Sequence, residues 1–171
     1  MKTSQNFGLI YFLLLIGQIV LCNYTNLGPF VMLSMLPAMI LCVPTGVGVI
    51  TCMLLAFVSG FCTDWLSEGI LGLNAAALLP VALARKGIIR IFLGEDIIAR
   101  KDSFSVRKSG LGKVTLTMSA ATAIFLAVYI LLDGAGTRPF WFCFSKFAVS
   151  LACNWPIGLI VINALVPDDR K

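Results

Sequence analysis

Residues 60–76 of this 171-residue chain read GFCTDWLSEGILGLNAA and join two long apolar segments. Gly69 and Gly72 permit a sharp turn and close packing, because glycine adopts backbone angles that other residues avoid. Asp64 and Asn74 flank that turn and can hydrogen-bond to the free N–H and C=O groups at helix ends. The stretch therefore predicts a tight hairpin between two membrane-spanning helices.

The composition of the whole chain points to a membrane protein. Hydrophobic residues make up 59% of the sequence and charged residues only 12%, with a mean hydropathy of +0.97. A water-soluble domain of this size could not bury so much apolar surface. The chain also has no histidine, the commonest metal ligand and general base. We therefore expect no enzyme activity, cofactor, metal or catalytic residue.

Six apolar segments can be traced along the sequence, and they predict one all-α membrane domain, residues 1–171, with about six transmembrane helices. Their approximate ranges are 7–22, 28–43, 45–62, 70–84, 114–132 and 140–166. The first is expected to be an uncleaved span rather than a signal peptide. Pro37 predicts a kink in the second. Ala56 and Gly60 form a small-residue face on the third, and the alanine-rich fourth segment is expected inside the bundle.

The distribution of charge predicts the orientation, since lysine and arginine remain on the cytoplasmic side of short membrane loops. The main basic loop contains Arg85, Lys86, Arg90, Arg100, Lys101, Arg107, Lys108 and Lys113 against Glu95, Asp96 and Asp102. With six spans, a cytoplasmic loop at this point makes both termini cytoplasmic, with Lys2 at one and Arg170 and Lys171 at the other. Asp64, Glu68, Asp133 and Arg138 then face outward. Because the basic residues gather in this loop, membrane orientation explains the net charge of +5 better than nucleic-acid binding does.

The first part of this loop has two possible structures. Isoleucines at positions 88, 89, 91, 97 and 98 alternate with charged residues, a pattern that favours an interfacial helix interrupted by Gly94. The alternative is a solvated connector. We favour the helix, because isoleucines in water would have no reason to cluster.

Polar residues within the sixth segment need partners at membrane depth. Lys146 lies about 9 Å inside the outer boundary if the helix begins at Phe140. Its amine can reach the interface along its own stem, or it can pair with Asp133 or Asp64. Asn154 and Pro156 are expected to open the helix and free a carbonyl for another partner.

The cysteines suggest neither a metal site nor a disulfide framework. They occur singly in or beside apolar segments, without a C-x-x-C pair, at positions Cys22, Cys42, Cys52, Cys62, Cys143 and Cys153. We interpret them as small buried hydrophobic residues.

The hairpin stretch also resembles a known family. Its pattern G-x-x-x-D, six to eight residues, then G-L-(N/H)-A is similar to that of the rod shape-determining protein MreD. The residues that carry this resemblance are Gly60, Asp64, Gly69, Gly72, Asn74 and Ala75. The chain length and the basic loop after the fourth span also fit this family.

The resemblance implies a non-catalytic scaffold of the bacterial cell-elongation complex in the inner membrane. Its implied partners are an MreC-like protein and, through it, MreB, RodA and a penicillin-binding transpeptidase. The implied fold is similar to the substrate-binding subunits of energy-coupling-factor vitamin transporters.

Two other functions remain open on the residues alone. In a transporter subunit, Asp64, Trp65, Asn74 and Lys146 would line an outward-facing ligand pocket. In an intramembrane enzyme, Asp64 and Asp133 would form a catalytic pair, although nothing in the sequence brings them together.

Overall fold

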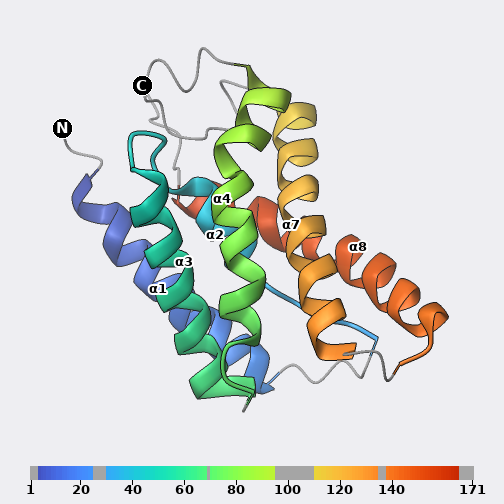
Figure 1. The fold of residues 1–171 in the computed structure, drawn as a ribbon. Helices are drawn as coiled ribbons and strands as arrows, with labels where there is room; N and C mark the ends of the chain where they lie inside the picture. Colours follow the sequence, from blue (N-terminus) through green and yellow to red (C-terminus); the bar gives the residue numbers. More distant parts are fainter. Residues whose placement is uncertain (1–3, 25–29, 69, 95–109, 135–137, 166–171) are drawn as a thin grey trace.

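The computed structural model describes residues 4–24, 30–68, 70–94, 110–134 and 138–165. All regular elements in these ranges are helical (Figure 1). They are α1 (Ser4–Tyr24), α2 (Leu36–Cys42), α3 (Val49–Thr63), the π-helical turn η1 (Asp64–Glu68), α4 (Leu73–Leu93), α7 (Leu111–Gly134) and α8 (Phe140–Leu165).

The long helices form a membrane bundle. Four helical stretches in the described part of the chain are long and apolar enough to cross a bilayer: Phe7–Tyr24, Val49–Ser67, Leu111–Gly134 and Phe140–Leu165. At 21 residues, α4 has a comparable length, about 32 Å, but its last half carries Arg85, Lys86 and Arg90. The predicted class, an all-helical membrane bundle, is therefore confirmed.

The second apolar segment is not a spanning helix, which corrects the expectation for residues 28–43. Its only helix, α2, has seven residues and is about 10 Å long. Pro37 does not kink it but lies in its first turn, where a missing N–H costs nothing. The helix ends at Val43, whose extended backbone is the conformation favoured before a proline such as Pro44.

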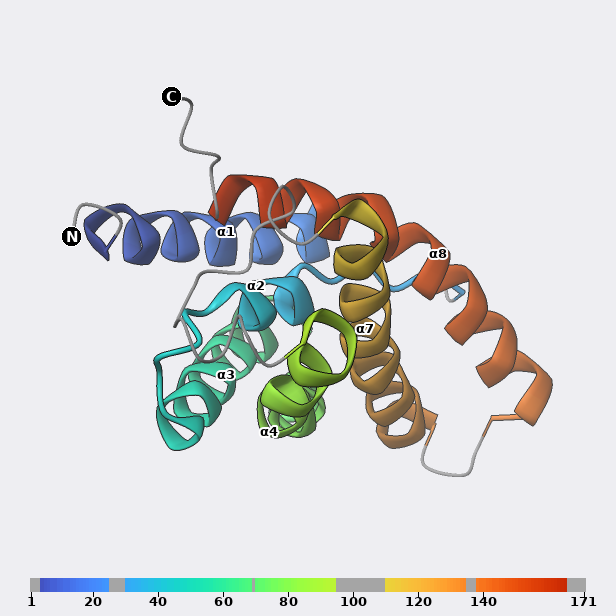
Figure 2. The same cartoon turned by 90° about the horizontal axis from the view of Figure 1, so that it is seen from above.

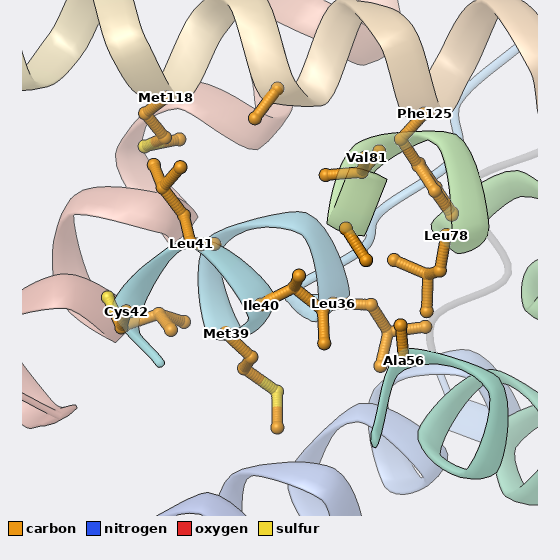
Figure 3. Packing of buried hydrophobic residues seen from close by; sticks show 14 of the residues in the cluster. Leu36, Met39, Ile40, Leu41, Cys42, Ala56, Leu78, Val81, Met118 and Phe125 are labelled. Carbon is orange, nitrogen blue, oxygen red and sulfur yellow. The ribbon is translucent and has the colours of Figure 1, made fainter. Parts of the chain in front are cut away.

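The other helices enclose this short one. In Figure 1, α4 lies between α3 and α7, and Figure 2 shows α1 and α8 side by side along another edge of the bundle. Every residue of α2 is buried. Its side chains meet the buried faces of α3, α4 and α7, as Figure 3 shows for Leu36, Ala56, Leu78 and Phe125. The core is therefore centred on a short helix held inside a ring of longer ones.

Small side chains allow the close packing of α3 against α4, as predicted. Ala56 and Gly60 on α3 are buried, and so are Ala75, Ala77 and Ala82 on α4. The exposed faces of α1 and α3 carry bulky side chains instead, such as Leu13 and Phe57. This division of small residues inside and large residues outside is typical of helices that pack in lipid.

The basic loop begins later than predicted. Because α4 continues to Leu93, the isoleucines up to Ile91 belong to its last turns rather than to a separate interfacial helix. Ile88 and Ile89 are buried in the bundle, which explains the cluster of isoleucines. The helix ends at Gly94, whose φ of 92° favours glycine. Residues 95–109, with most of the predicted loop, lie outside the described residues.

Candidate functional site

The predicted hairpin is formed by the end of α3, η1 and the start of α4. The chain leaves α3 at Thr63 and continues through the π-helical turn from Asp64 to Glu68. It enters α4 after Gly72, whose φ of 96° lies in the left-handed region. Glycine is favoured there because a Cβ would be strained. Gly69 lies outside the described residues.

Asp64 is the centre of this hairpin and is fully buried, with 0% of its surface exposed. Its Oδ1 accepts hydrogen bonds from the backbone N–H of Asn74 at 3.0 Å and from the Asn74 Nδ2 at 2.9 Å. Its Oδ2 accepts from the backbone N–H groups of Gly72 at 3.0 Å and Ala75 at 3.2 Å. These backbone donors belong to the first turn of α4, where no intrahelical acceptor exists. Asp64 therefore caps α4 from another helix, and its charge also suits the positive end of the helix dipole.

Gly60 brings the two helices into backbone contact one turn before Asp64. A Cβ added at this position would lie 2.5 Å from the Ala75 Cα and 2.6 Å from the Ala75 nitrogen. Only glycine therefore fits without moving the helices apart. Five of the six residues that carry the family resemblance, Gly60, Asp64, Gly72, Asn74 and Ala75, thus lie in one packed unit.

The Asp64 carboxylate is poorly suited to catalysis in this arrangement. Both of its oxygens already accept two hydrogen bonds, so neither is free to take a proton from a substrate or attack one. The Asn74 Oδ1 is buried and makes no hydrogen bond to any described residue. Trp65, the next residue after Asp64, is 67% exposed on the surface of the bundle. In the described part of the hairpin, the Asp64 carboxylate is therefore used to hold the start of α4.

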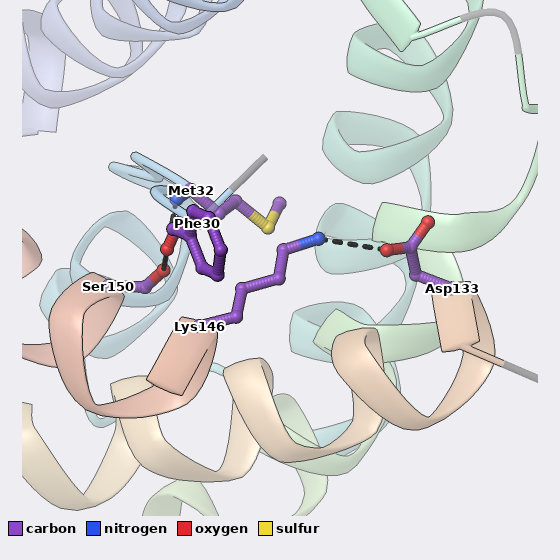
Figure 4. A network of polar contacts seen from close by, with 5 residues as sticks. All are labelled: Phe30, Met32, Asp133, Lys146 and Ser150. Atoms are coloured by element: carbon purple, nitrogen blue, oxygen red, sulfur yellow. Dashed lines mark hydrogen bonds and ion pairs between the residues drawn. The ribbon is translucent and has the colours of Figure 1, made fainter. Parts of the chain in front are cut away.

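Lys146 forms the second polar cluster, between α8 and α7. Its Nζ lies 2.8 Å from the Asp133 Oδ2 (Figure 4) and 5.5 Å from the centre of the Tyr129 ring. Both charged side chains are largely buried. Of the alternatives for Lys146, the structure therefore has the pair with Asp133, rather than an amine extended alone to the interface or a pair with Asp64.

A third cluster binds the non-helical segment, residues 30–35, to α8. The Ser150 Oγ accepts from the backbone N–H of Met32 at 2.9 Å (Figure 4). The Asn154 Oδ1 accepts from the N–H of Ser34 at 2.7 Å, while its Nδ2 donates to the carbonyl of Met32 at 2.8 Å. Asn154 thus supplies both an acceptor and a donor, as a neighbouring β-strand would. Helix α8 itself continues through Pro156, so the predicted opening there is not seen.

Helix α1 binds the same segment from the opposite side. The Gln18 Oε1 accepts from the N–H of Met35 at 2.6 Å, and its Nε2 donates to the carbonyl of Leu33 at 3.3 Å. Irregular backbone at membrane depth is tolerated only where protein groups satisfy it. Gln18, Ser150 and Asn154 together provide those groups. A lone glutamine in the first apolar segment was the available signal for Gln18, which the sequence analysis did not single out.

Arg85 is a buried cation that the sequence analysis placed in a loop. Only 1% of its surface is exposed. Its Nε donates to the carbonyl of Leu41 near the end of α2 at 3.3 Å, and its Nη1 lies 4.0 Å from the Cys52 Sγ. Its Nη2 has no hydrogen-bond partner among the described residues. A cation suits the negative C-terminal end of a helix such as α2.

Neither alternative site from the sequence analysis is assembled. Asp64 binds the start of α4, and Asp133 binds Lys146, so the two acids are engaged separately. Asp64 and Asn74 are in contact, but Trp65 points outward and Lys146 belongs to the other cluster. Across the described residues, no three or more Cys, Asp or Glu side chains are grouped to hold a metal ion. No disulfide joins any of the six cysteines, all of which lie within the described residues.

No protein-family model, curated protein or solved structure matches this chain. The hairpin and the buried polar contacts are therefore the basis for assigning a function.

Proposed function

We propose that this protein is a non-catalytic scaffold of the bacterial inner membrane that acts in the cell-elongation complex, as its resemblance to MreD implies. The observation that carries the proposal is the Asp64 cap. Five of the six residues that give the resemblance hold α3 and α4 together at the hairpin. A motif whose described members serve one joint between helices suits a protein that presents a fixed surface to partners.

The buried charges support a structural role as well. The acceptor sites of Asp64 are occupied by α4, and Lys146 is neutralised by Asp133. Asp64, Asp133 and Lys146 therefore each contact a neighbouring element, and removing one member of such a contact would leave a buried group unpaired. Reaction chemistry in the complex would then belong to the partners, an MreC-like protein and, through it, MreB, RodA and a penicillin-binding transpeptidase.

The proposed topology has six membrane crossings and a fold resembling the substrate-binding subunits of energy-coupling-factor transporters. The second crossing would consist of residues 30–48, in which α2 is the only helix. In support, α1 begins at the same end of the bundle at which α4 ends and α7 begins (Figure 1). That end would be cytoplasmic, because Lys86, Arg90 and Lys113 lie near it. Both termini would then be cytoplasmic and the Asp64 hairpin would lie at the outer surface.

Depletion of the protein in its native cells tests the proposal. Rod-shaped cells are expected to become round, or wall growth to be disturbed in cells of another shape. Affinity purification from native membranes is expected to recover an MreC-like protein. Unchanged morphology together with no such partner would refute the scaffold, and a tightly retained vitamin would favour the transporter subunit instead.

A complementation assay links the phenotype to the hairpin. Asp64→Ala is expected to restore shape poorly because it removes the cap of α4. Ser67→Ala is the matched control in the same turn, since among the described residues the Ser67 hydroxyl bonds only to the Thr63 carbonyl, at 2.6 Å. Both variants are compared at equal amounts of protein in the membrane.

A further inference from the structure

A groove lies between helices α7 and α8 on the surface of the bundle. The two helices pack closely where Gly158 faces Met118: a Cβ on Gly158 would overlap the end of the Met118 side chain, which would then have to shift. The two helices are also in contact near the other end of α7, where Asp133 pairs with Lys146. A groove of about 600 Å³ opens between them. Leu116, Phe144 and Trp155 line it and are more than half exposed, so it faces the lipid.

Small side chains from both helices line this groove. Thr115 and Ser119 lie four residues apart on α7, and Ala148 and Ala152 lie four residues apart on α8. Residues at this spacing lie on one helix face. Pairs of small residues let another helix approach until the backbones nearly touch. Larger side chains line the rest of the α8 face, namely Phe144, Phe147, Leu151 and Trp155.

Two polar side chains in the groove have no hydrogen-bond partner among the described residues. Thr122 lines the groove with only 2% of its surface exposed, and its hydroxyl makes no hydrogen bond to another described residue. The same is true of the less buried Ser119. Other hydroxyls on α7 bond to their own helix: Thr115 to the Gly112 carbonyl at 2.8 Å and Thr117 to the Lys113 carbonyl at 2.7 Å. A hydroxyl left unbonded in a hydrocarbon environment gains from a polar partner.

We propose that this groove binds one transmembrane helix of a partner protein. The contacting face of that helix would carry small residues and one hydrogen-bonding side chain, such as Asn, Gln, Ser or Thr, placed against Ser119 and Thr122. An acyl chain fits less well because it offers no group to bond to a hydroxyl. This inference rests on the scaffold function, for which it supplies a binding surface.

A second copy of this chain is a poorer occupant. In a two-fold dimer the same patch meets itself, so two concave grooves would face each other. The exposed faces of α1 and α3 carry side chains such as Leu13 and Phe57, which are too large to approach the small residues of the groove closely. The groove therefore fits a helix with a different surface.

The binding test uses the full-length protein in phosphatidylcholine vesicles with synthetic transmembrane peptides, and reads association by energy transfer. Three peptides are compared: all-leucine, leucine with a Gly/Ala face, and the same Gly/Ala face with one Asn. The Asn peptide is expected to bind about tenfold more tightly than the all-leucine peptide. The double variant Ser119→Ala with Thr122→Val should lose about tenfold in affinity for it.

Two further variants separate the groove from general effects. Thr117→Val is the control: Thr117 does not line the groove and its hydroxyl is already bonded within α7, so affinity should stay unchanged. Ala148→Leu with Ala152→Leu fills the groove and should abolish binding. Thermal unfolding of each variant shows whether the fold is retained.

Several outcomes would overturn the proposal: equal binding of all three peptides, no binding of any, or undiminished binding to the filled groove. Self-association lost on filling the groove would identify a second copy instead, and bound lipid lost on filling it would identify an acyl chain. None of these measurements uses cell shape, so the helix-binding groove can be refuted while the scaffold function is supported. Equally, the scaffold function can be refuted while the groove is supported.

Discussion

Removing the Asp64 carboxylate should destabilise the protein more than any other change of equal size in the hairpin. Asp64→Ala leaves three backbone N–H groups of α4 and one side-chain amide without their acceptor. A buried donor left unpaired costs about 1–3 kcal/mol. The Asn74 amide can rotate and water can reach part of this bundle end, so we expect a total of about 3–5 kcal/mol. Asp64→Asn should cost about half as much. The amide oxygen of the asparagine can still accept from two of the four donors, whereas its NH2 group cannot accept from the other two.

Reversible unfolding in mixed micelles, followed by tryptophan fluorescence, measures these free energies. Trp65 adjoins Asp64 and reports on the hairpin directly. Ser67→Ala is the control and should shift the free energy of unfolding by less than about 0.5 kcal/mol. A loss below about 1 kcal/mol for Asp64→Ala, or a loss for Asp64→Asn as large as that for Asp64→Ala, would contradict the proposed cap.

Three other changes test the packing and the buried polar contacts. Gly60→Ala should destabilise the protein by about 1–3 kcal/mol because its methyl group meets the backbone of α4. The control Gly87→Ala adds a methyl group that meets nothing within 4 Å, so it should be neutral or stabilising, and equal free energies of unfolding for the two variants would refute the contact. Lys146→Met should lower the free energy of unfolding by about 3–5 kcal/mol because it leaves Asp133 unpaired, and adding Asp133→Asn should restore part of this loss. If the effects of the two single substitutions simply add in the double variant, the two side chains are not coupled. Asn154→Leu should cost about 2–4 kcal/mol by leaving two backbone groups of the non-helical segment unpaired, and unchanged amide hydrogen exchange in residues 30–35 would count against that role.

The parts of the fold that could be predicted are those that depend on local pattern. Hydropathy identified the long helices, because any chain that crosses lipid must satisfy its backbone within a helix. The hairpin was also predictable, because a glycine near a turn, such as Gly72, usually adopts a left-handed backbone angle and an aspartate there, such as Asp64, usually caps a helix. The family resemblance and the function that it implies remain predictions.

The predictions that were wrong concern structure that depends on contacts between segments distant in the sequence. Residues 28–43 are apolar enough for a span, but side chains of Gln18, Ser150 and Asn154 satisfy the non-helical backbone within them. Arg85 was assigned to a loop because an arginine normally marks the end of a span. Its partner, the carbonyl of Leu41, is 44 residues away, and no periodicity in the sequence records that contact.

The hydrogen bonds from α8 to the non-helical segment have a consequence for biosynthesis. Met32 and Ser34 leave the ribosome well over a hundred residues before Ser150 and Asn154, with which they pair. Until α8 is made, their backbone groups cannot enter lipid alone without a large penalty. In the proposed topology, the second crossing should therefore be completed after translation, with residues 30–48 held meanwhile in the insertion channel or at the membrane surface. A chain truncated before α8 should accumulate as an incompletely inserted species that membrane proteases degrade.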